Sequence, residues 1–269
     1  MKNKVISHGG QSRGEYLTFA KQLALKSGDI MLKYFQVGLE SKVKNDKSIV
    51  SVADEEINQL VIDEVSKEYP DFSVFGEEGS VHKKSNFVWV CDPLDGTVPF
   101  VKGLPVSVFS LALVEDGKPI VGVVYDPFTK RLYCGTLGGG ATLNDSSIIV
   151  SNKILDRQAT IDSEWYPNTK FDFDPACHEL SFKTGVYVLH IGSTINAACM
   201  VASGQLEAMI FDGSEGKNVD IAAVKVIVEE AGGKVTDLFG NEQRYDQAIK
   251  GAIVSNGIVH DQLINLVEV

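Results

Sequence analysis

Two carboxylates stand at the end of an apolar run in the first half of the chain. Residues 87–91 have the length and composition of a buried strand, and Asp92 and Asp95 follow at its end. Buried strands seldom end in two acids unless a cation or a turn requires them. Pro93 places a turn between the acids, so both carboxylates and the carbonyl of Leu94 can point to one place. Mg²⁺ takes oxygen ligands of this kind.

A hydroxyl and two backbone amides follow the second acid. Gly96 and Thr97 stand at the expected start of a helix, and amides at a helix N-terminus bind phosphate. Acids for a cation beside amides for an anion indicate metal-assisted transfer of a phosphoryl group to water. The alternative interpretation is an Asp-Pro turn without chemistry, because Asp, Pro and Gly are common in turns.

Further acids lie at the ends of other predicted elements. Glu77 and Glu78 follow a Gly after a short apolar run, Asp220 begins one predicted helix, and Asp54 lies at the start of another. Taken singly, the two glutamates indicate surface charges and the two aspartates indicate helix caps. Their combination with residues 92–97 favours a single metal site.

The elements that must position these residues follow from the spacing of apolar residues. Helical spacing predicts a long helix over residues 15–35 and a second one over residues 53–68. Residues 42–51 are predicted as a loop or an irregular hairpin. A mostly antiparallel meander is expected over residues 73–136, with a tight turn at Asp116-Gly117.

The second half alternates between strands and helices. Strands are expected at 160–162, 185–191, 206–211, 235–236 and 251–255, and helices at 193–203, 219–231 and 258–267. Residues 163–178 are expected to be irregular. The pattern predicts an N-terminal α+β half, residues 1–155, that carries the metal site. A C-terminal α/β half, residues 156–269, is expected to carry the substrate contacts and Asp220.

Composition restricts the class of protein. The chain of 269 residues carries a formal net charge of −11, which argues against a nucleic-acid partner. Its four cysteines are far apart and are expected to be free thiols in a reducing compartment. Residues 1–13 lack the apolar core of a signal peptide, and no apolar run reaches membrane-spanning length. We therefore expect a cytoplasmic protein without a membrane partner.

Several motifs, in order along the chain, resemble those of the inositol monophosphatase family of Mg²⁺-dependent, lithium-sensitive phosphatases. They are Gly76-Glu77-Glu78, Asp92-Pro93-Leu94-Asp95-Gly96-Thr97, Asp220-Ile221-Ala222-Ala223 and Glu230-Ala231-Gly232-Gly233, with residues 44–54, 138–144 and 255–257 fitting as well. The resemblance runs from about Phe19 to Leu266. It implies a layered αβαβα sandwich of the sugar phosphatase and inositol monophosphatase type, and a homodimer.

The resemblance also implies roles for the acids. Glu77, Asp92 and the carbonyl of Leu94 would hold one Mg²⁺, and Asp92, Asp95 and Asp220 a second. A third, weaker ion would use Glu77 and water.

The remaining implied roles concern water, phosphate and substrate. Asp54 with Thr97 would orient and help to deprotonate the attacking water, and the amides of Gly96 and Thr97 would hold the phosphate. Gly192, Ser193 and Thr194 would face the substrate hydroxyls, with Asp220 also on the substrate side. An acid of residues 212–215 would bind the polyol. Asp212 is the preferred candidate and Glu215 the alternative.

The sequence departs from the family pattern in ways that bear on substrate choice. Pro99 stands where Asn is usual and Val219 where Trp is usual. Pro is acceptable in a first helical turn, so the helix after Gly96 is expected to survive. Lys44 or Lys42 could reach the third ion and the phosphate, the alternative being a solvated surface charge.

The implied function is hydrolysis of the phosphate monoester of a small polyol, with inositol 1-phosphate as the default substrate. Fructose 1,6-bisphosphate, histidinol phosphate and 3'-phosphoadenosine 5'-phosphate are alternatives within the family. The first and last favour extra basic residues, of which the chain shows few. A different class, a non-catalytic regulator that binds metal or sugar phosphate, is disfavoured by the retained acids and Thr97.

Overall fold

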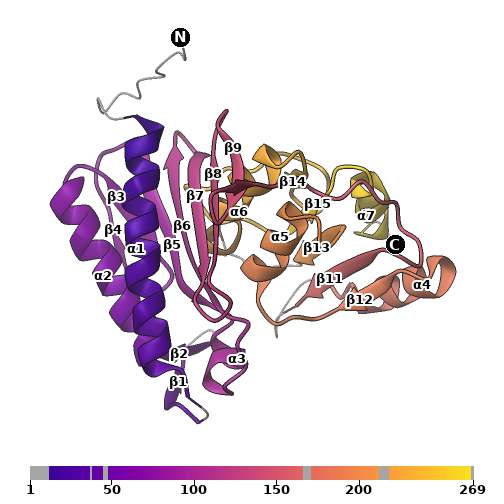
Figure 1. The fold of residues 1–269 in the computed structure, drawn as a ribbon, viewed down its shortest axis with the longest axis horizontal. Coiled ribbons are helices and arrows are strands. Elements are labelled where there is room, and N and C mark those ends of the chain that lie inside the picture. Colours follow the sequence, from indigo (N-terminus) through magenta and orange to yellow (C-terminus); the bar gives the residue numbers. More distant parts are fainter. Residues whose placement is uncertain (1–11, 37, 45–47, 166–170, 212–217, 268–269) are drawn as a thin grey trace.

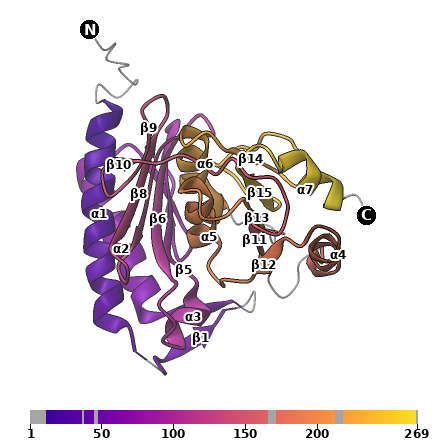
Figure 2. The same cartoon turned by 45° about the vertical axis from the view of Figure 1, so that its right-hand side comes forward.

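The computed structural model describes residues 12–36, 38–44, 48–165, 171–211 and 218–267, and its elements form five stacked layers (Figure 1). Helices α1 (Arg13–Tyr34) and α2 (Val52–Glu68) cover the outer face of a first sheet. Helices α5 (Thr194–Ala202) and α6 (Asn218–Glu230) lie between this sheet and a second one. Helices α4 (Asp174–Thr184) and α7 (His260–Val267) lie beyond the second sheet (Figure 2). The predicted αβαβα sandwich is confirmed.

The first sheet has eight strands in the order β10-β9-β8-β7-β6-β5-β3-β4. Its strands are β3 (Ser73–Gly76), β4 (Ser80–Val81), β5 (Phe87–Asp95), β6 (Val108–Glu115), β7 (Lys118–Asp126), β8 (Arg131–Thr136), β9 (Gly140–Leu143) and β10 (Ser146–Ser147). Among the strand pairs of this sheet in the described residues, only β3–β5 is parallel, so the meander is mostly antiparallel as predicted. Separately, β1 (Ser41–Val43) and β2 (Ile49–Ser51) form an antiparallel hairpin, which confirms that alternative for residues 42–51.

The second sheet has five strands in the order β12-β11-β13-β15-β14. They are β11 (Thr160–Glu164), β12 (Tyr187–Leu189), β13 (Ala208–Phe211), β14 (Lys234–Thr236) and β15 (Ala252–Ser255). Strand β11 pairs in parallel with both β12 and β13, and β15 pairs antiparallel with β13 and β14. The strands of the first sheet end at residue 147, and those of the second sheet begin at residue 160. We propose that the two halves of the chain meet at residue 155.

Strand β5 is buried over its whole length because both of its faces are covered. Phe87, Trp89 and Cys91 pack into the core beneath α1 and α2. The alternate residues Val88 and Val90 pack into the core shared with α5 and α6. A strand covered on both faces must be apolar at every position rather than at alternate ones, which explains the continuous run in the sequence. The strand is therefore a rigid support for the acids at its end.

Two expectations were wrong. The strand does not break at Asp92-Pro93 but continues to Asp95, with a change of register between Asp92 and Asp95 that absorbs Pro93. The stretch 163–178 is not irregular throughout, because residues 163–164 belong to strand β11 and residues 174–178 to helix α4. Among the hydrophobic side chains of α4 only Cys177 is buried, so the helix lacks the apolar periodicity that identifies helices in a sequence.

None of the helices in the described part of the chain is long and apolar enough to cross a membrane.

Candidate active site

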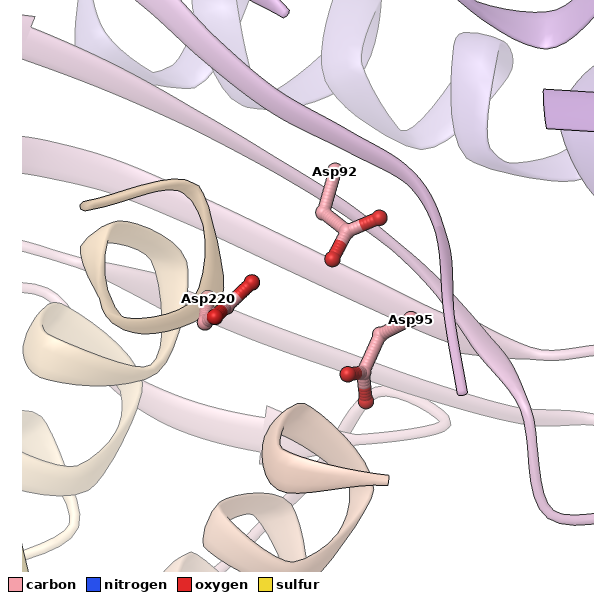
Figure 3. A group of neighbouring side chains, drawn as sticks. All are labelled: Asp92, Asp95 and Asp220. Atoms are coloured by element: carbon pink, nitrogen blue, oxygen red, sulfur yellow. The ribbon is translucent and has the colours of Figure 1, made fainter. Parts of the chain in front are cut away.

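Three buried carboxylates meet where the end of β5 approaches the start of α6. Asp92 and Asp95 come from β5 and Asp220 comes from the first turn of α6, and the three side chains face a common space (Figure 3). One oxygen of each lies within 4.8 Å of the others. Their exposed fractions are 1%, 3% and 3%. The structure thus brings together three predicted ligands that lie up to 128 positions apart, from Asp92 to Asp220.

The local backbone aims the two acids of β5. The carboxylate of Asp92 accepts the amide of Leu94 at 2.9 Å, which closes a turn around Pro93. The change of register between Asp92 and Asp95 re-aims the strand, as a bulge does. Acids three positions apart on a regular strand would point to opposite faces, so the irregularity is what brings both carboxylates to one site.

Asp95 is held by the start of α5 in the second half of the chain. Its Oδ2 accepts the hydroxyl of Ser193, and it accepts the amide of Ile195 at 2.9 Å. Burial, followed by the nearby charge of Asp220, raises the pKa of Asp95 to about 8 in the metal-free protein. Two donors are therefore not enough to offset the cost of the buried charge.

The donor set fits a hard divalent cation. Buried carboxylates are normally paired with a cation or bind a metal, and Mg²⁺ is held by a few carboxylate oxygens together with water and phosphate oxygens. Asp92, Asp95 and Asp220 offer oxygen donors only. The raised pKa of Asp95 reflects its burial and the nearby like charge of Asp220. A cation bound between these carboxylates would relieve this repulsion.

Gly96 and Thr97 connect this cluster to helix α3 (Thr97–Val101). Gly96 has φ +81°, and a Cβ there would lie 3.0 Å from the carbonyl oxygen of Gly192. Only glycine meets both conditions without strain. The helix forms with Pro99 in its first turn, which confirms the expectation that it survives this residue.

The hydroxyl of Thr97 links the end of β5 to the start of α2. Its Oγ1 lies 3.0 Å from Oδ1 of Asp54 and 3.1 Å from the carbonyl oxygen of Leu94. Asp54 also closes a capping box with Ser51, accepting the Ser51 amide at 2.9 Å and its hydroxyl at 2.6 Å. Asp54 is therefore part of a cap, and at the same time it reaches the predicted active site. Burial is the main cause that raises its pKa to about 6.

Glu77 lies outside the compact group of three carboxylates. Its backbone amide donates to the carbonyl of Cys91 on β5 at 3.2 Å. Lys44, from the turn of the β1–β2 hairpin, places its Nζ 3.3 Å from Glu77 and 2.8 Å from Glu78. Lys44 is thus an ion-paired group beside the site and not a solvated charge, whereas Lys42 pairs with the exposed Glu55.

The predicted substrate residues divide into two sets. Gly192, Ser193 and Thr194 lie at the start of α5, and Ser193 contacts Asp95 directly. Asp212 and Glu215 lie outside the described residues.

Sequence reasoning missed two acids of β11. Oδ2 of Asp162 accepts the amide of Ile191 at 3.1 Å, and Oε1 of Glu164 accepts the amide of Gly192 at 2.5 Å. Asp162 lies in the predicted strand 160–162, but Glu164 lies in the stretch that was expected to be irregular. The two acids share one face only because β11 continues to Glu164.

Comparisons with known proteins agree with this geometry. The sequence profile of the inositol monophosphatase family matches residues 13–268. A fructose-1,6-bisphosphatase/inositol-1-monophosphatase of Thermotoga maritima is 33% identical over 93% of this chain and 95% of its own length. Inositol monophosphatase 2 of Solanum lycopersicum is 31% identical over 93% of this chain and 97% of its own. Nus factor SuhB of Pasteurella multocida is 34% identical over 83% and 85%.

Solved structures show the same fold. A Thermotoga maritima IMPase superposes with a TM-score of 0.84 at 31% identity, covering 94% of this chain and 97% of its own. The extragenic suppressor protein suhB of Bartonella henselae gives a TM-score of 0.86 at 26% identity, covering 94% and 98%. Fold and family together define an enzyme, a phosphoric monoester hydrolase. The chain belongs to the inositol monophosphatase family.

Proposed function

We propose that this enzyme hydrolyses the phosphate monoester of a small polyol, with inositol 1-phosphate as the first expected substrate, in a reaction that requires two or three Mg²⁺ ions. The convergence of Asp92, Asp95 and Asp220 within 4.8 Å, next to the Thr97–Asp54 pair, is the observation that carries this proposal. Fructose 1,6-bisphosphate is a second candidate because two relatives bear the name fructose-1,6-bisphosphatase/inositol-1-monophosphatase.

The metal ligands are assigned as follows. Asp92, Asp95 and Asp220 would hold one ion, and Asp92, Glu77 and the carbonyl of Leu94 would hold another. A third ion at Glu77 would compete with Lys44, which already binds that carboxylate. When bound, Mg²⁺ would supply a water of lowered pKa and neutralise charge on the phosphate and the leaving oxygen.

Thr97 and Asp54 would orient the attacking water. A hydroxyl has one proton to donate and two lone pairs that accept. When Thr97 Oγ1 donates to Asp54 at 3.0 Å rather than to the Leu94 carbonyl at 3.1 Å, its lone pairs would be available to accept a proton of the water. Asp54 is fixed by its cap with Ser51, so the direction of the Thr97 hydroxyl is fixed as well. The amides of Gly96 and Thr97 at the start of α3 would bind the phosphate.

The polyol would be bound from the second half of the chain. Gly192, Ser193 and Thr194 precede or begin α5 next to Asp95, and Asp220 joins them from α6. We propose Asp212 as the acid that contacts the polyol hydroxyls, with Glu215 as the alternative.

Two further proposals concern the state of the protein. Four buried free thiols, at Cys91, Cys134, Cys177 and Cys199, support a reducing compartment such as the cytoplasm. The homodimer is proposed from the family resemblance.

A panel of phosphate monoesters tests the proposal. Purified protein with Mg²⁺ is assayed for phosphate release from inositol 1-phosphate, fructose 1,6-bisphosphate, histidinol phosphate and 3'-phosphoadenosine 5'-phosphate. The proposal predicts the highest kcat/KM for a polyol or sugar phosphate. Turnover of the nucleotide alone would contradict the substrate class, and absence of turnover with every compound would favour the non-catalytic regulator.

A further inference from the structure

The segment between β12 and α5 is attached to β11 by two carboxyl groups that the proposed reaction does not use. Asp162 accepts the Ile191 amide at 3.1 Å and Glu164 accepts the Gly192 amide at 2.5 Å. The exposed fractions of Asp162 and Glu164 are 0% and 6%. Two successive backbone amides therefore each have a buried carboxyl group as their acceptor, an arrangement that fixes the path of the backbone at this point.

The next residues of this segment bind Asp95. The Ser193 hydroxyl and the Ile195 amide both donate to Oδ2 of Asp95. Among the described residues, the hydrogen bonds to this carboxylate all fall on Oδ2, so Oδ1 is the oxygen left to face a cation. The path from Asp162 and Glu164 to a predicted metal ligand spans only residues 191–195.

The opposite side of the segment is also restricted. Gly192 has φ +80°, and a Cβ on it would lie 3.1 Å from Cγ of Pro99. The Pro99 ring thus covers the segment from the α3 side while Glu164 binds it from the β11 side. A loop held on both faces has little freedom to adjust, so the position of Ser193 depends on the β11 acceptors.

The charge of Glu164 acts on Asp162, which lies two positions earlier on the same strand. Burial, followed by the charge of Glu164, raises the pKa of Asp162 to about 9. A protonated Asp162 still has Oδ2 available as the acceptor of the Ile191 amide. Asn at position 162 has the same shape and offers the same donor and acceptor, whereas Ala offers neither.

We propose that Asp162 and Glu164 are positioning residues that hold residues 191–195 so that Ser193 and Ile195 fix Asp95 for metal binding. This inference rests on the proposed function, since it assigns Asp95 to the metal site. Asp162 and Glu164 lie on β11, apart from the proposed metal ligands, and they reach residues 191–195 through the Ile191 and Gly192 amides.

The test compares Asp162→Ala, Asp162→Asn and a matched control, Glu207→Ala. Glu207 is also buried, at 1% exposure, and accepts the Thr160 amide at 2.6 Å on the same strand. It has no link to residues 191–195 among the described contacts. Mn²⁺ affinity is measured by electron paramagnetic resonance, and protection of the Ile195 amide by hydrogen exchange in the metal-free protein. The kinetic split between kcat and KM is measured with the preferred phosphate monoester.

Outer partners of metal ligands typically contribute about 10–100-fold to metal affinity or activity. Asp162→Ala is expected to weaken Mn²⁺ binding about 10-fold, to lower kcat more than it raises KM, and to reduce protection of the Ile195 amide. Asp162→Asn should stay within about threefold of wild type, and Glu207→Ala should leave Mn²⁺ affinity unchanged even if it lowers stability. If Asp162→Ala does not fold, Glu164→Ala at the end of β11 takes its place.

Unchanged Mn²⁺ affinity and Ile195 protection in the folded Ala variant would overturn the positioning role. An equal loss of affinity in Glu207→Ala would also overturn it, because the effect would then be general destabilisation. The two proposals fail separately. A wild-type protein that releases no phosphate from any substrate refutes the proposed function, while the Mn²⁺ and exchange measurements still decide the role of Asp162 and Glu164.

Discussion

Asp95→Asn is expected to stabilise the metal-free protein while removing its response to Mg²⁺. Asp95 is buried within 4.8 Å of two other carboxylates, and its pKa is raised to about 8 by burial and by Asp220. At an effective dielectric constant of about 20, two unit charges at this distance repel by about 3 kcal/mol. The folded protein avoids this repulsion by keeping Asp95 protonated, which costs free energy near pH 7. Asn carries no charge, so the substitution removes that cost, and it keeps the shape of the side chain and an oxygen for the Ile195 amide.

Proton linkage determines whether this carboxyl group stabilises or destabilises the metal-free protein. A carboxyl whose pKa is raised on folding binds more protons in the folded state than in the unfolded state, so metal-free stability falls as pH rises from about 4 to about 8. At pH 7 the rise of the Asp95 pKa from 3.8 to about 8 corresponds to a loss of stability of about 4 kcal/mol. Water penetration and relaxation of the protein reduce this loss. We therefore expect Asp95→Asn to gain about 2 kcal/mol. For a chain of this length the gain corresponds to a rise in Tm of about 4 °C.

Thermal unfolding followed by circular dichroism, in EDTA and in millimolar Mg²⁺, measures both effects. Wild type should gain about 1–3 kcal/mol from Mg²⁺ at 10–100 times its dissociation constant, and Asp95→Asn should gain little. Asp126→Asn is the matched control, because Asp126 is equally buried at 3% but accepts the amides of Phe128 and Thr129. That variant should lose stability and keep the Mg²⁺ response. An Asp95→Asn protein that is less stable than wild type in EDTA, or that keeps the full Mg²⁺ shift, would refute the reasoning.

Three further predictions concern single residues. Thr97→Val removes only the hydroxyl and should lower kcat about 100-fold or more with Mn²⁺ affinity retained, whereas Thr97→Ser should keep most of the turnover; equal rates in the two variants would contradict the role of the hydroxyl. Burial lowers the pKa of His260 to about 4, so its contribution to stability is present above about pH 6.5 and is lost as pH falls toward 4. Urea unfolding should show a loss of roughly 2 kcal/mol by about pH 5 that His260→Gln removes, and an unchanged slope in that variant would refute this. Gly96→Ala should cost about 1–3 kcal/mol and lower turnover, because its Cβ would meet the Gly192 carbonyl at 3.0 Å. Gly138→Ala, where φ is also positive but the Cβ meets nothing within 4 Å, should cost less and keep turnover.

The sequence was sufficient to predict the candidate site where the acids directly follow a recognisable strand pattern, as in residues 87–97. The apolar run before Asp92 predicts a buried strand, which the structure has as β5. The family resemblance predicts that Asp220 lies with Asp92 and Asp95, and their carboxylates lie together in the structure. The continuation of β5 to Asp95 was missed because Pro93 usually ends a strand, and the irregular register that accommodates it depends on pairing with β6.

Contacts between distant segments were beyond sequence reasoning. Asp162 lies in a predicted strand and Glu164 in a stretch expected to be irregular. Only the packing of β11 beside β12 brings the Ile191 and Gly192 amides to them. Lys44 was left between two interpretations because its partners, Glu77 and Glu78, lie more than 30 positions away. In each case the decisive information is the packing of elements, which local propensity and periodicity do not contain.

Phosphate release from inositol 1-phosphate by wild type and by Asp220→Asn, each in Mg²⁺ and in EDTA, tests the central claim most directly. Asp220 is the carboxylate that the second half of the chain contributes to the cluster. We predict rapid release by wild type in Mg²⁺, none above background in EDTA, and a loss of at least about 100-fold in the variant with its fold retained. Release that persists in EDTA, or wild-type turnover by Asp220→Asn, would contradict the assignment of these carboxylates to a catalytic Mg²⁺ site.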